Sequence, residues 1–450
     1  MPFKKIKPFL FAAFFIACLL LLTAGCAGRP TTMPPPLLES ACGAWPQFQN
    51  DLYNSGVTTA SAPVSDPAVA WKQRVGNNDM AGVNVAPLVA GGNVYVLDAF
   101  GKAWAFEAKT GARKWTTQLS AGRMKFQLAT PACDSGRLYV ATNDGYVYAL
   151  DAADGRVLWR KNVKLASEAS QLNTTVKCTG GKIYVGAWTP DAASNEYYYC
   201  LDATTGKPGI GRKYRVPNTA APGGYYWAGS CVVERCLIFG SDRSVLTCLD
   251  KDSGELLDSV DLKTIVPEAK EIRSSVSYDP DTRMLFLTDQ ARNDGSCWAF
   301  SLDPDTGKLT HRWHTRLGFS TSTPAVYNGR LYVGTGIYSI KGGVYCLEEQ
   351  TGNVIWRFLH TDEGATSVPG VQASPVVSVQ NGSPYIYYAT IWEDSSVFCL
   401  DQNGKQVWEF NDQDSTYILQ SVAVADGCLY FGNDGGWVYA LQPATAPAAD

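Results

Sequence analysis

The sequence predicts an all-β protein, an eight-bladed β-propeller with four antiparallel strands per blade and a ring closed by an N-terminal strand. A turn that ends in glycine recurs about every 49 residues, which suits four short strands. Eight inner strands can be counted, the first near residues 85–87 and the last at 421–424. The last repeat lacks its fourth strand, and a segment of matching type stands at residues 70–75. Pairing of these two ends would leave the sheet without an open edge.

The four strands of a blade are clearest in the repeat at residues 323–356. Strands are expected at residues 323–326, 329–334, 344–347 and 351–356, each bounded by turn residues. The turn before the fourth strand recurs as Thr110-Gly111, Asp154-Gly155, Thr205-Gly206, Ser253-Gly254, Thr306-Gly307, Thr351-Gly352 and Asn403-Gly404. Tryptophans recur at one repeat position in the fourth strands, as Trp115, Trp159, Trp313, Trp356 and Trp408. We interpret them as packing residues that every blade needs.

The first 25 residues are typical of an export signal. Lys4, Lys5 and Lys7 precede an apolar run at residues 9–22, which is shorter than the roughly 20 residues that cross a bilayer. Leu-Thr-Ala-Gly-Cys at residues 22–26 resembles a bacterial lipobox, which implies that Cys26 becomes a lipidated N-terminus. An ordinary cleavable signal is the alternative. Proline-rich residues 26–44 are expected to tether the lipid to a single propeller at 45–441, with a C-terminal tail at 442–450.

The repeated phrase itself carries a family resemblance. Residues 148–159, Tyr-Ala-Leu-Asp-Ala-Ala-Asp-Gly-Arg-Val-Leu-Trp, resemble the PQQ-like propeller repeat of quinoprotein dehydrogenases and of the BamB family of outer-membrane assembly lipoproteins. The opening Trp-Pro-Gln-Phe-Gln-Asn-Asp at residues 45–51 is also typical of such chains. The resemblance covers roughly residues 45–441. It is specific for the fold and weak for function, because one fold hosts many activities.

Charge and motifs argue against several functions. The 38 Lys and Arg residues against 42 Asp and Glu give a net charge of −4, so nucleic acid is not an expected partner. The sequence has no Gly-x-Ser-x-Gly elbow, no phosphate-binding glycine-rich loop and no metalloprotease histidine pair. We therefore predict no catalytic residues and no metal site. Of the 13 cysteines, Cys200, Cys248, Cys346 and Cys399 share one repeat position, which is typical of a small hydrophobe.

The resemblance to quinoprotein dehydrogenases implies a cofactor pocket that can be looked for. Such enzymes hold PQQ with calcium by means of a tryptophan platform, cation-binding carboxylates and a catalytic aspartate, and many have two adjacent cysteines. This sequence has no adjacent cysteines and no Cys-x-x-Cys-His haem attachment. We therefore expect no cofactor, and PQQ with calcium is the alternative.

One face of the propeller is expected to carry the binding loops. The loops between second and third strands, and those between blades, share that face and hold the length variation. Aromatic residues stand in these loops: Trp188, Tyr225, Tyr226, Trp227, Tyr338 and Trp392. We predict that they contact a partner protein, with Trp188, Trp227 and Trp392 as the main anchors. The alternative is that the rings pack over the strand ends.

Aspartates also recur on this face, near the turn between second and third strands. Those considered for cation binding are Asp98, Asp144, Asp242, Asp394 and Asp434. Asp191 and Asp289 stand at equivalent places. Because Asp before Gly is ordinary in hairpin turns, a structural role is favoured over cation binding.

The sequence thus predicts a non-enzymatic, lipid-anchored scaffold, similar to BamB in outer-membrane protein assembly. Its expected partners are envelope proteins, including an outer-membrane assembly barrel, and the membrane through the N-terminal lipid. It is expected to be a monomer within a complex, on the periplasmic face of the outer membrane if the host has one and otherwise at the cell surface. An exported PQQ-dependent quinoprotein oxidoreductase and a surface module that binds a polymer are the alternatives.

Overall fold

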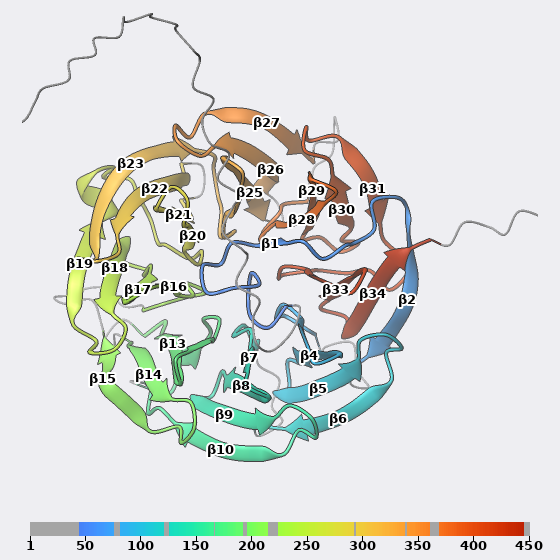
Figure 1. The fold of residues 1–450 in the computed structure, drawn as a ribbon, viewed down its shortest axis with the longest axis horizontal. Helices are drawn as coiled ribbons and strands as arrows, with labels where there is room; N and C mark the ends of the chain where they lie inside the picture. Colours follow the sequence, from blue (N-terminus) through green and yellow to red (C-terminus); the bar gives the residue numbers. More distant parts are fainter. Residues whose placement is uncertain are drawn as a thin grey trace, which may run out of the picture. The chain divides into compact units, whose positions relative to one another are not determined.

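The computed structural model describes residues 45–75, 82–120, 126–165, 167–191, 196–214, 224–291, 294–337, 340–360 and 369–444. Cys26, the expected signal and tether, and Tyr338 lie outside these residues. The described residues form eight antiparallel blades of four strands arranged in a ring (Figure 1), so the predicted eight-bladed propeller is confirmed. Their one helical element is a 3-10 turn, η1 (Leu262–Thr264). No helix among the described residues is long and apolar enough to span a membrane.

Each blade runs outward from the ring axis through four strands. The innermost strands are β3 (Leu88–Ala90), β7 (Ala132–Asp134), β12 (Lys177–Thr179), β16 (Cys231–Val233), β20 (Ser277–Asp279), β24 (Ala325–Tyr327), β28 (Val376–Gln380) and β32 (Ala423–Ala425). The second strands are β4 (Asn93–Leu97), β8 (Arg137–Thr142), β13 (Lys182–Trp188), β17 (Cys236–Phe239), β21 (Met284–Thr288), β25 (Arg330–Ile337), β29 (Ser383–Ala389) and β33 (Cys428–Gly432).

The outer half of each blade is made in the same way. The third strands are β5 (Lys102–Glu107), β9 (Tyr146–Asp151), β14 (Tyr198–Asp202), β18 (Val245–Asp250), β22 (Ser296–Asp303), β26 (Ile340–Glu348), β30 (Val397–Leu400) and β34 (Trp437–Pro443). The outermost strands are β6 (Arg113–Gln118), β10 (Val157–Asn162), β15 (Pro208–Tyr214), β19 (Leu256–Asp261), β23 (Lys308–Arg316), β27 (Val354–Leu359), β31 (Gln406–Phe410) and β2 (Pro67–Arg74). The short β11 (Gln171–Leu172) adds to β13. We number the blades from β3, so that β2 belongs to blade 8.

The ring is closed by an N-terminal strand, as the sequence predicts. β2 is the outermost strand of blade 8 and pairs antiparallel with β34, from Pro67 opposite Pro443 to Arg74 opposite Trp437. Chain segments from the two ends of the propeller therefore share one sheet. This pairing ties the first and last blades together and leaves no open edge between them.

The N-terminal residues 45–58 follow the inner strands around the ring axis. The second residue of six inner strands donates its backbone N–H to this segment: Val89 to Trp45, Cys133 to Pro46, Val232 to Leu52, Tyr278 to Tyr53, Val326 to Ser55 and Val377 to Gly56, at 2.7 to 3.0 Å. The segment ends in β1 (Val57–Thr58), which pairs parallel with β28 at the centre of the ring (Figure 1). These bonds satisfy inner-strand donors that the blades themselves leave unpaired.

Two buried side chains reinforce this axial segment. Asn54 donates to the carbonyls of Ser230 and Val276, at 3.0 and 2.7 Å. The Lys177 ammonium donates to the carbonyls of Phe48 and Asp51, at 3.0 and 2.6 Å. Burial lowers the pKa of Lys177 to about 8, and the Asp51 carboxylate opposes that shift. A charged amine is therefore held inside the ring by carbonyls and one carboxylate.

Neighbouring blades are joined by one repeated contact. In seven blades the turn between the third and fourth strands offers a backbone carbonyl, and in blade 8 the carbonyl is that of Pro63, just before β2. A donor from the preceding blade reaches each of these carbonyls. In six blades the donor is a tryptophan indole N–H: Trp71 to Ala108, Trp115 to Ala152, Trp159 to Ala203, Trp313 to Glu349, Trp356 to Gln402 and Trp408 to Pro63, at 2.8 to 3.1 Å. The interpretation of these tryptophans as interblade packing residues is thus confirmed.

The turn glycine completes this contact. A Cβ added to Gly155 would lie 2.4 Å from Cε3 of Trp115, and Gly111, Gly206, Gly352 and Gly404 lie equally close to their tryptophans. The Gly155 φ is +75°, a conformation that favours glycine. The turn therefore needs glycine both for its backbone and for the indole ring that packs against it.

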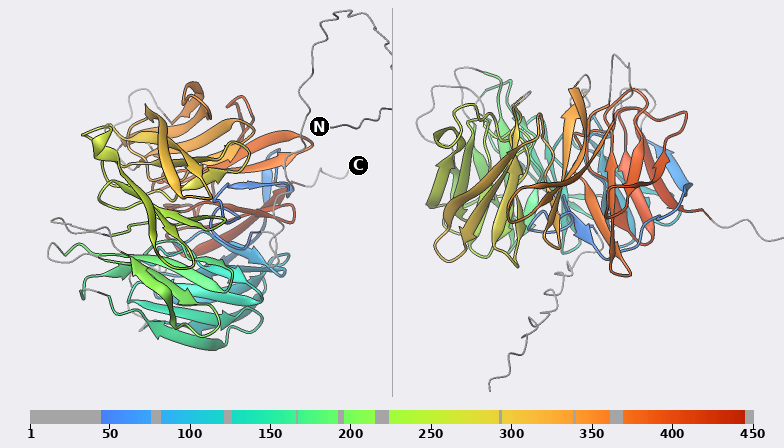
Figure 2. Two further views of the ribbon diagram at one scale, coloured as in Figure 1. Left: turned by 60° about the vertical axis from the view of Figure 1, so that its left-hand side comes forward. Right: turned by 90° about the horizontal axis from the view of Figure 1, so that it is seen from above.

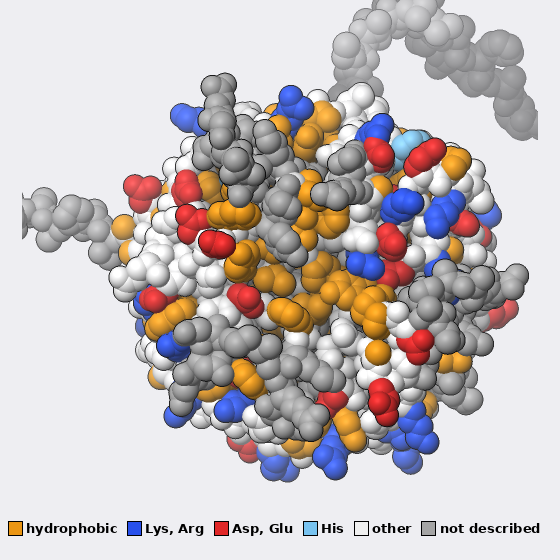
Figure 3. Space-filling model, turned by 180° about the vertical axis from the view of Figure 1, so that it is seen from behind, with side chains coloured by type: hydrophobic (Ala, Val, Ile, Leu, Met, Phe, Trp, Pro, Cys, Tyr) orange, Lys and Arg blue, Asp and Glu red, His pale blue; other side chains and the backbone are white. Residues whose placement is uncertain are grey.

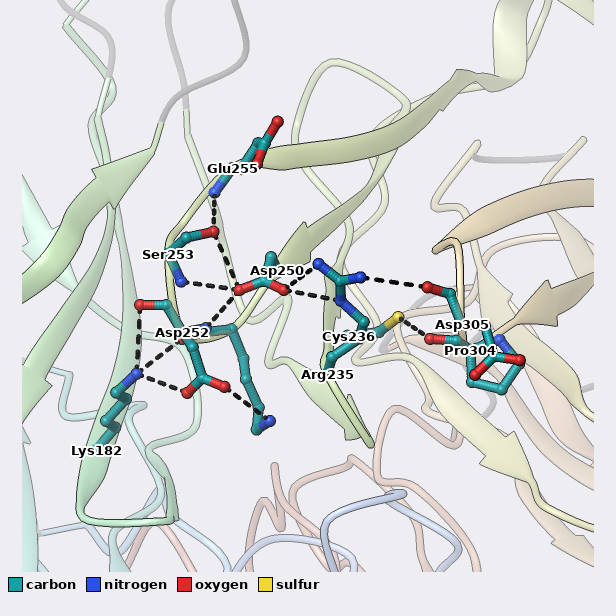
Figure 4. A network of polar contacts seen from close by, with 10 residues as sticks. Lys182, Arg235, Cys236, Asp250, Asp252, Ser253, Glu255, Pro304 and Asp305 are labelled. Carbon is teal, nitrogen blue, oxygen red and sulfur yellow. Dashed lines mark hydrogen bonds and ion pairs between the residues drawn. The ribbon is translucent and has the colours of Figure 1, made fainter.

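Blades 3 and 4 lack this tryptophan, and other donors reach the next turn carbonyl, among them Lys182 and Cys236 (Figure 4). Ile210 and Asp258 stand where other repeats have tryptophan. The carbonyl of Lys251 accepts from the Tyr184 hydroxyl at 3.0 Å and from Lys182 Nζ at 3.5 Å. The carbonyl of Pro304 accepts from the Cys236 thiol at 3.5 Å. All eight carbonyls are therefore satisfied, although two of them use other chemistry.

The turn glycine can be tested in blade 2. Gly155→Ala and Gly136→Ala both place a side chain at φ near +75°, but only the first meets an indole, since nothing lies within 4 Å of a Cβ at Gly136. Both should lose about 1 kcal/mol of unfolding free energy. Gly155→Ala should lose about 1 to 3 kcal/mol more from overpacking. Urea unfolding measures both, and equal losses would contradict the indole contact.

Lys177 provides a test of the axial segment. Lys177→Met removes the donors to Phe48 and Asp51 and leaves the Asp51 carboxylate buried without its counter-charge. We expect a loss of about 2 to 4 kcal/mol in the free energy of unfolding. The exposed Lys114→Met should change it by less than about 0.5 kcal/mol. Equal effects would mean that backbone hydrogen bonds alone hold the segment.

Candidate functional site

The loops between second and third strands and those between blades share one face of the ring, as predicted from strand alternation. In the edge-on view of Figure 2 the strands run between two opposite faces. Hydrophobic side chains gather around the middle of the loop face (Figure 3). This face therefore combines variable loops with exposed apolar surface, the combination expected of a binding surface.

Four of the predicted residues meet here across blades 3 to 5. Trp188 ends β13, Tyr226 and Trp227 precede β16, and Asp242 follows β17. The Trp188 and Tyr226 rings meet edge-on with centroids 4.8 Å apart, and the Tyr226 and Trp227 centroids lie 5.0 Å apart. All three rings are half-buried. We call Trp188, Tyr226, Trp227, Asp242 and Arg273 the aromatic cluster.

Arg273, just before β20, holds the aromatic cluster together. Its Nε and Nη2 donate to the two oxygens of Asp242, both at 3.1 Å. The guanidinium lies over the Tyr226 ring, 4.6 Å from the centroid. The Trp188 indole N–H donates to Asp242 at 2.5 Å. The rings are therefore fixed around a charge pair and are already ordered for contact with a partner.

Asp242 is the most buried member of the aromatic cluster, with a side chain 6% exposed. Burial raises the pKa of its carboxyl, and the Arg273 charge and hydrogen bonds oppose that rise. The carboxylate thus depends on Arg273 to stay charged. Loss of the arginine would leave a buried charge with the Trp188 N–H as its remaining side-chain donor.

Trp227 has a strained backbone at the edge of this cluster. Its φ is +60°, which is uncommon for a bulky residue. Its indole N–H is buried and has no partner among the described residues. Strain of this kind persists where the surroundings impose it and often marks a functional position.

The remaining predicted aromatic residues lie apart from the aromatic cluster. Tyr225 is buried and packs against Tyr198 and Phe239, with centroids 5.1 and 5.3 Å away. It therefore fills the interior of the blades rather than offering a surface. Trp392 is half-buried in the loop between β29 and β30, on blade 7. Tyr338 and Cys26 lie outside the described residues, so their roles stay predictions.

The aspartates considered for cation binding have local partners. Asp98 accepts from Trp104 Nε1 at 2.9 Å and from two backbone N–H groups. Asp144 accepts from Thr142 Oγ1 at 2.6 Å, Asp434 accepts from Asn84 Nδ2 at 2.9 Å, and Asp394 is exposed. Within the part of the chain that is described, no three His, Cys, Asp or Glu residues are placed to share an ion. A cation-binding role for these aspartates stays a prediction.

A narrow axial funnel opens on the same face, beside the aromatic cluster. It is narrow, and the roughly 340 Å³ of empty space within it includes open solvent. Trp227, Arg273, Thr321 and Gln372 are among its lining residues, and Phe48 of the axial segment lies at it too. The funnel thus joins the aromatic cluster to the centre of the ring.

The funnel does not supply the donors that calcium and PQQ need. Its described lining contains one cationic residue, Arg273, and no Asp or Glu. Calcium takes carboxylate and carbonyl oxygens, usually several at once. The nearby Asp242 carboxylate is already paired with Arg273. The lining of this funnel therefore does not fit a calcium-bound PQQ.

Sequence reasoning missed Arg273 and the funnel. Arg273 stands in a plain stretch, Ile272-Arg273-Ser274, with no motif around it. Its one distinguishing signal was position, because it lies just before an inner strand and would face the axis. That signal becomes useful only when the eight inner strands are superimposed.

The ring of four-stranded blades, joined by indoles and turn glycines, defines a PQQ-like β-propeller. Comparison with known families places the chain within this class. A family model described as outer membrane protein assembly factor BamB matches residues 57–260 and 291–447. The chain belongs to this family.

Individual relatives are more distant. A quinohemoprotein alcohol dehydrogenase of Comamonas testosteroni is 25% identical over 281 residues, which cover 56% of this chain and 35% of that protein. BamB of Burkholderia pseudomallei is 25% identical over 173 residues, covering 38% of this chain and 43% of that protein. The chain thus spans less than half the length of these relatives. The structure of BamB from Moraxella catarrhalis matches with a TM-score of 0.60 at 17% identity, covering 86% of this chain and 100% of that one. That likeness shows the fold.

The charge pair of the aromatic cluster can be tested by a double-mutant cycle. Arg273→Gln should lower the free energy of unfolding by about 2 to 3 kcal/mol at pH 7, because Asp242 is left buried and charged. Adding Asp242→Asn should recover part of that loss. In Arg273→Gln alone the folded-state pKa of Asp242 rises further, so the folded state binds more protons and the deficit should shrink as pH falls. Urea unfolding at pH 5 and 7 measures this, and additive effects would contradict the pairing.

Proposed function

We propose that this protein is a non-enzymatic scaffold that holds other envelope proteins, anchored to the membrane by a lipid on Cys26. The observation that carries the proposal is the aromatic cluster, in which three half-exposed rings surround a fixed arginine on the loop face. Trp, Tyr and Arg are the residues that most often dominate protein interfaces. Membership of the BamB family supports a partner that is itself an assembly component.

The geometry suits protein contact because the rings are held in place before the partner arrives. Trp188 and Tyr226 are oriented by Asp242 and Arg273, so little side-chain freedom remains to be lost on binding. Their outer surfaces are open to water, and a partner would bury them. A partner with an apolar side chain to place between the rings would match this surface best.

In this proposal the chain acts at the cell envelope, as a monomer within a larger complex and without a resident cofactor. The basic and apolar start of the sequence, followed by Cys26, supports export and lipidation. The partner would be an outer-membrane assembly barrel where the host has an outer membrane. Oxidoreductase activity is less well supported, because the described funnel lining lacks the carboxylates that a calcium-bound PQQ would need.

The proposal is tested by purifying the lipidated full chain from mildly solubilised native membranes and identifying bound proteins by mass spectrometry. Trp188→Ala combined with Tyr226→Ala should reduce the recovery of the specific partner at least about tenfold, since such interface residues often contribute 2 kcal/mol or more. Trp392→Ala, a tryptophan on the same face but on blade 7, is the matched variant. Circular dichroism checks that each variant is folded.

The outcomes separate the alternatives. Loss of a barrel partner in the double variant alone supports the scaffold and locates its surface. Loss of the partner in Trp392→Ala alone would place the binding surface on blade 7. Recovery of a polysaccharide instead of a protein would favour a polymer-binding module. A PQQ-dependent rise in melting temperature, with no protein partner, would overturn the scaffold in favour of an enzyme.

A further inference from the structure

The funnel is built from two stacked rings of residues, one residue per blade in each. The inner ring comprises Ala86, Thr130, Thr175, Gly229, Ser275, Thr323, Ser374 and Ser421. Each stands three residues before the second residue of its inner strand, and six of the eight carry a hydroxyl. The outer ring, two residues earlier, comprises Asn84, Leu128, Asn173, Trp227, Arg273, Thr321, Gln372 and Leu419. Residues from both rings line the funnel.

The inner-ring hydroxyls are used as acceptors by the neighbouring blade. The backbone N–H groups of Ala86, Gly229, Ser275 and Thr323 donate to the hydroxyls of Thr130, Ser275, Thr323 and Ser374, at 2.9 to 3.1 Å. A hydroxyl that accepts in this way still has its own proton to donate. None of these four hydroxyls has an acceptor among the described residues. The ring therefore offers O–H donors that the blades do not use.

Other polar groups at the funnel have no partner at all among the described residues. Thr175 and Thr321 are 4% and 7% exposed, and their hydroxyls are unbonded. The buried indole N–H of Trp227 is likewise unbonded. Buried groups of this kind cost free energy unless water or a ligand satisfies them. Several such groups at one place indicate a site whose missing hydrogen bonds are supplied by a ligand or by water.

The charge of the funnel lining determines which kind of ligand could satisfy these unbonded groups. Arg273 binds Asp242 through Nε and Nη2, which leaves hydrogens on Nη1 and Nη2 for a further acceptor. Nη1 lies 3.5 Å from Gln290 Oε1, a weak contact. The described lining otherwise has donors, amides and apolar groups, and no carboxylate. Such a site favours an oxyanion, and the planar guanidinium edge matches a planar carboxylate.

We propose that the axial funnel binds a carboxylate group carried on a slender stem, with Arg273 and the buried hydroxyls of Thr175 and Thr321 as its donors. The small enclosed space admits a narrow group better than a fused ring system. The carboxylate belongs either to a free small acid or to the end of a polypeptide. This binding is separate from the scaffold function, because it uses the funnel rather than the outer surfaces of Trp188 and Tyr226.

The test is calorimetric titration of the full chain with matched acids and amides. Glutarate represents a free acid and N-acetyl-triglycine a chain end, and glutaramide and N-acetyl-triglycinamide are their uncharged partners. We expect saturable binding of an acid and at least about tenfold weaker binding of its amide, because a charge-assisted hydrogen bond is lost. Preference for one acid over the other identifies the source. Equal binding of acid and amide, tighter binding of inorganic phosphate, or no saturable heat would overturn the proposal.

Two variants locate the site. Thr175→Val with Thr321→Val removes no hydrogen bond between described residues, so the melting temperature should not fall, whereas acid affinity should fall about threefold to tenfold. Arg273→Gln should weaken acid binding about tenfold to a hundredfold. The exposed Arg156→Gln changes the net charge equally and should leave binding unchanged. Full acid affinity in the threonine double variant, with the melting temperature unchanged, would place the ligand elsewhere and overturn the assignment.

Discussion

The ring depends on one contact made eight times, between a donor in one blade and a backbone carbonyl of the next. Six of the donors are indoles, and five of these indoles also pack against a turn whose glycine leaves room for the ring. This explains why the turn and the tryptophan recur together in the sequence. Where Ile210 and Asp258 replace tryptophan, Tyr184, Lys182 and Cys236 reach the same carbonyls. The carbonyl is therefore the constant element, and the donor can vary as long as one is present.

The repeated contact keeps the blades in place but leaves the centre of the ring open, and the N-terminal segment has to close it. Residues 45–58 accept hydrogen bonds from six inner strands, Asn54 of this segment donates to two blades, and Lys177 of β12 donates to the segment. The same chain end then supplies β2 to blade 8. One stretch of sequence thus both fills the axis and closes the ring. The funnel that remains opens on the loop face, beside the aromatic cluster.

The fold could be predicted from the sequence because its constraints repeat. The repeat period is visible in the turn glycines and in Trp115 and its equivalents. The last repeat lacks its fourth strand, which shows where the ring closes. The site could be predicted only in part, because its members do not repeat. Tyr225 and Tyr226 are adjacent in sequence, yet one fills the interior and the other faces Arg273. The Asp242–Arg273 pair joins residues of different blades, and no local pattern shows that the ring brings them together.

Function in such a ring is best sought where the repeat is broken. The inner ring of the funnel is nearly uniform, with six hydroxyls in eight places, and four of these hydroxyls accept an N–H from the neighbouring blade in the same geometry. The outer ring, two residues away, has six different residue types in its eight places. Where packing does not restrict the residue type, binding can determine it. Trp227 and Arg273 stand at such positions, and both carry unusual features, a strained backbone in one and a shared charge in the other. Residues that repeat in every blade thus build the ring, whereas residues that vary between blades give this ring its own chemistry.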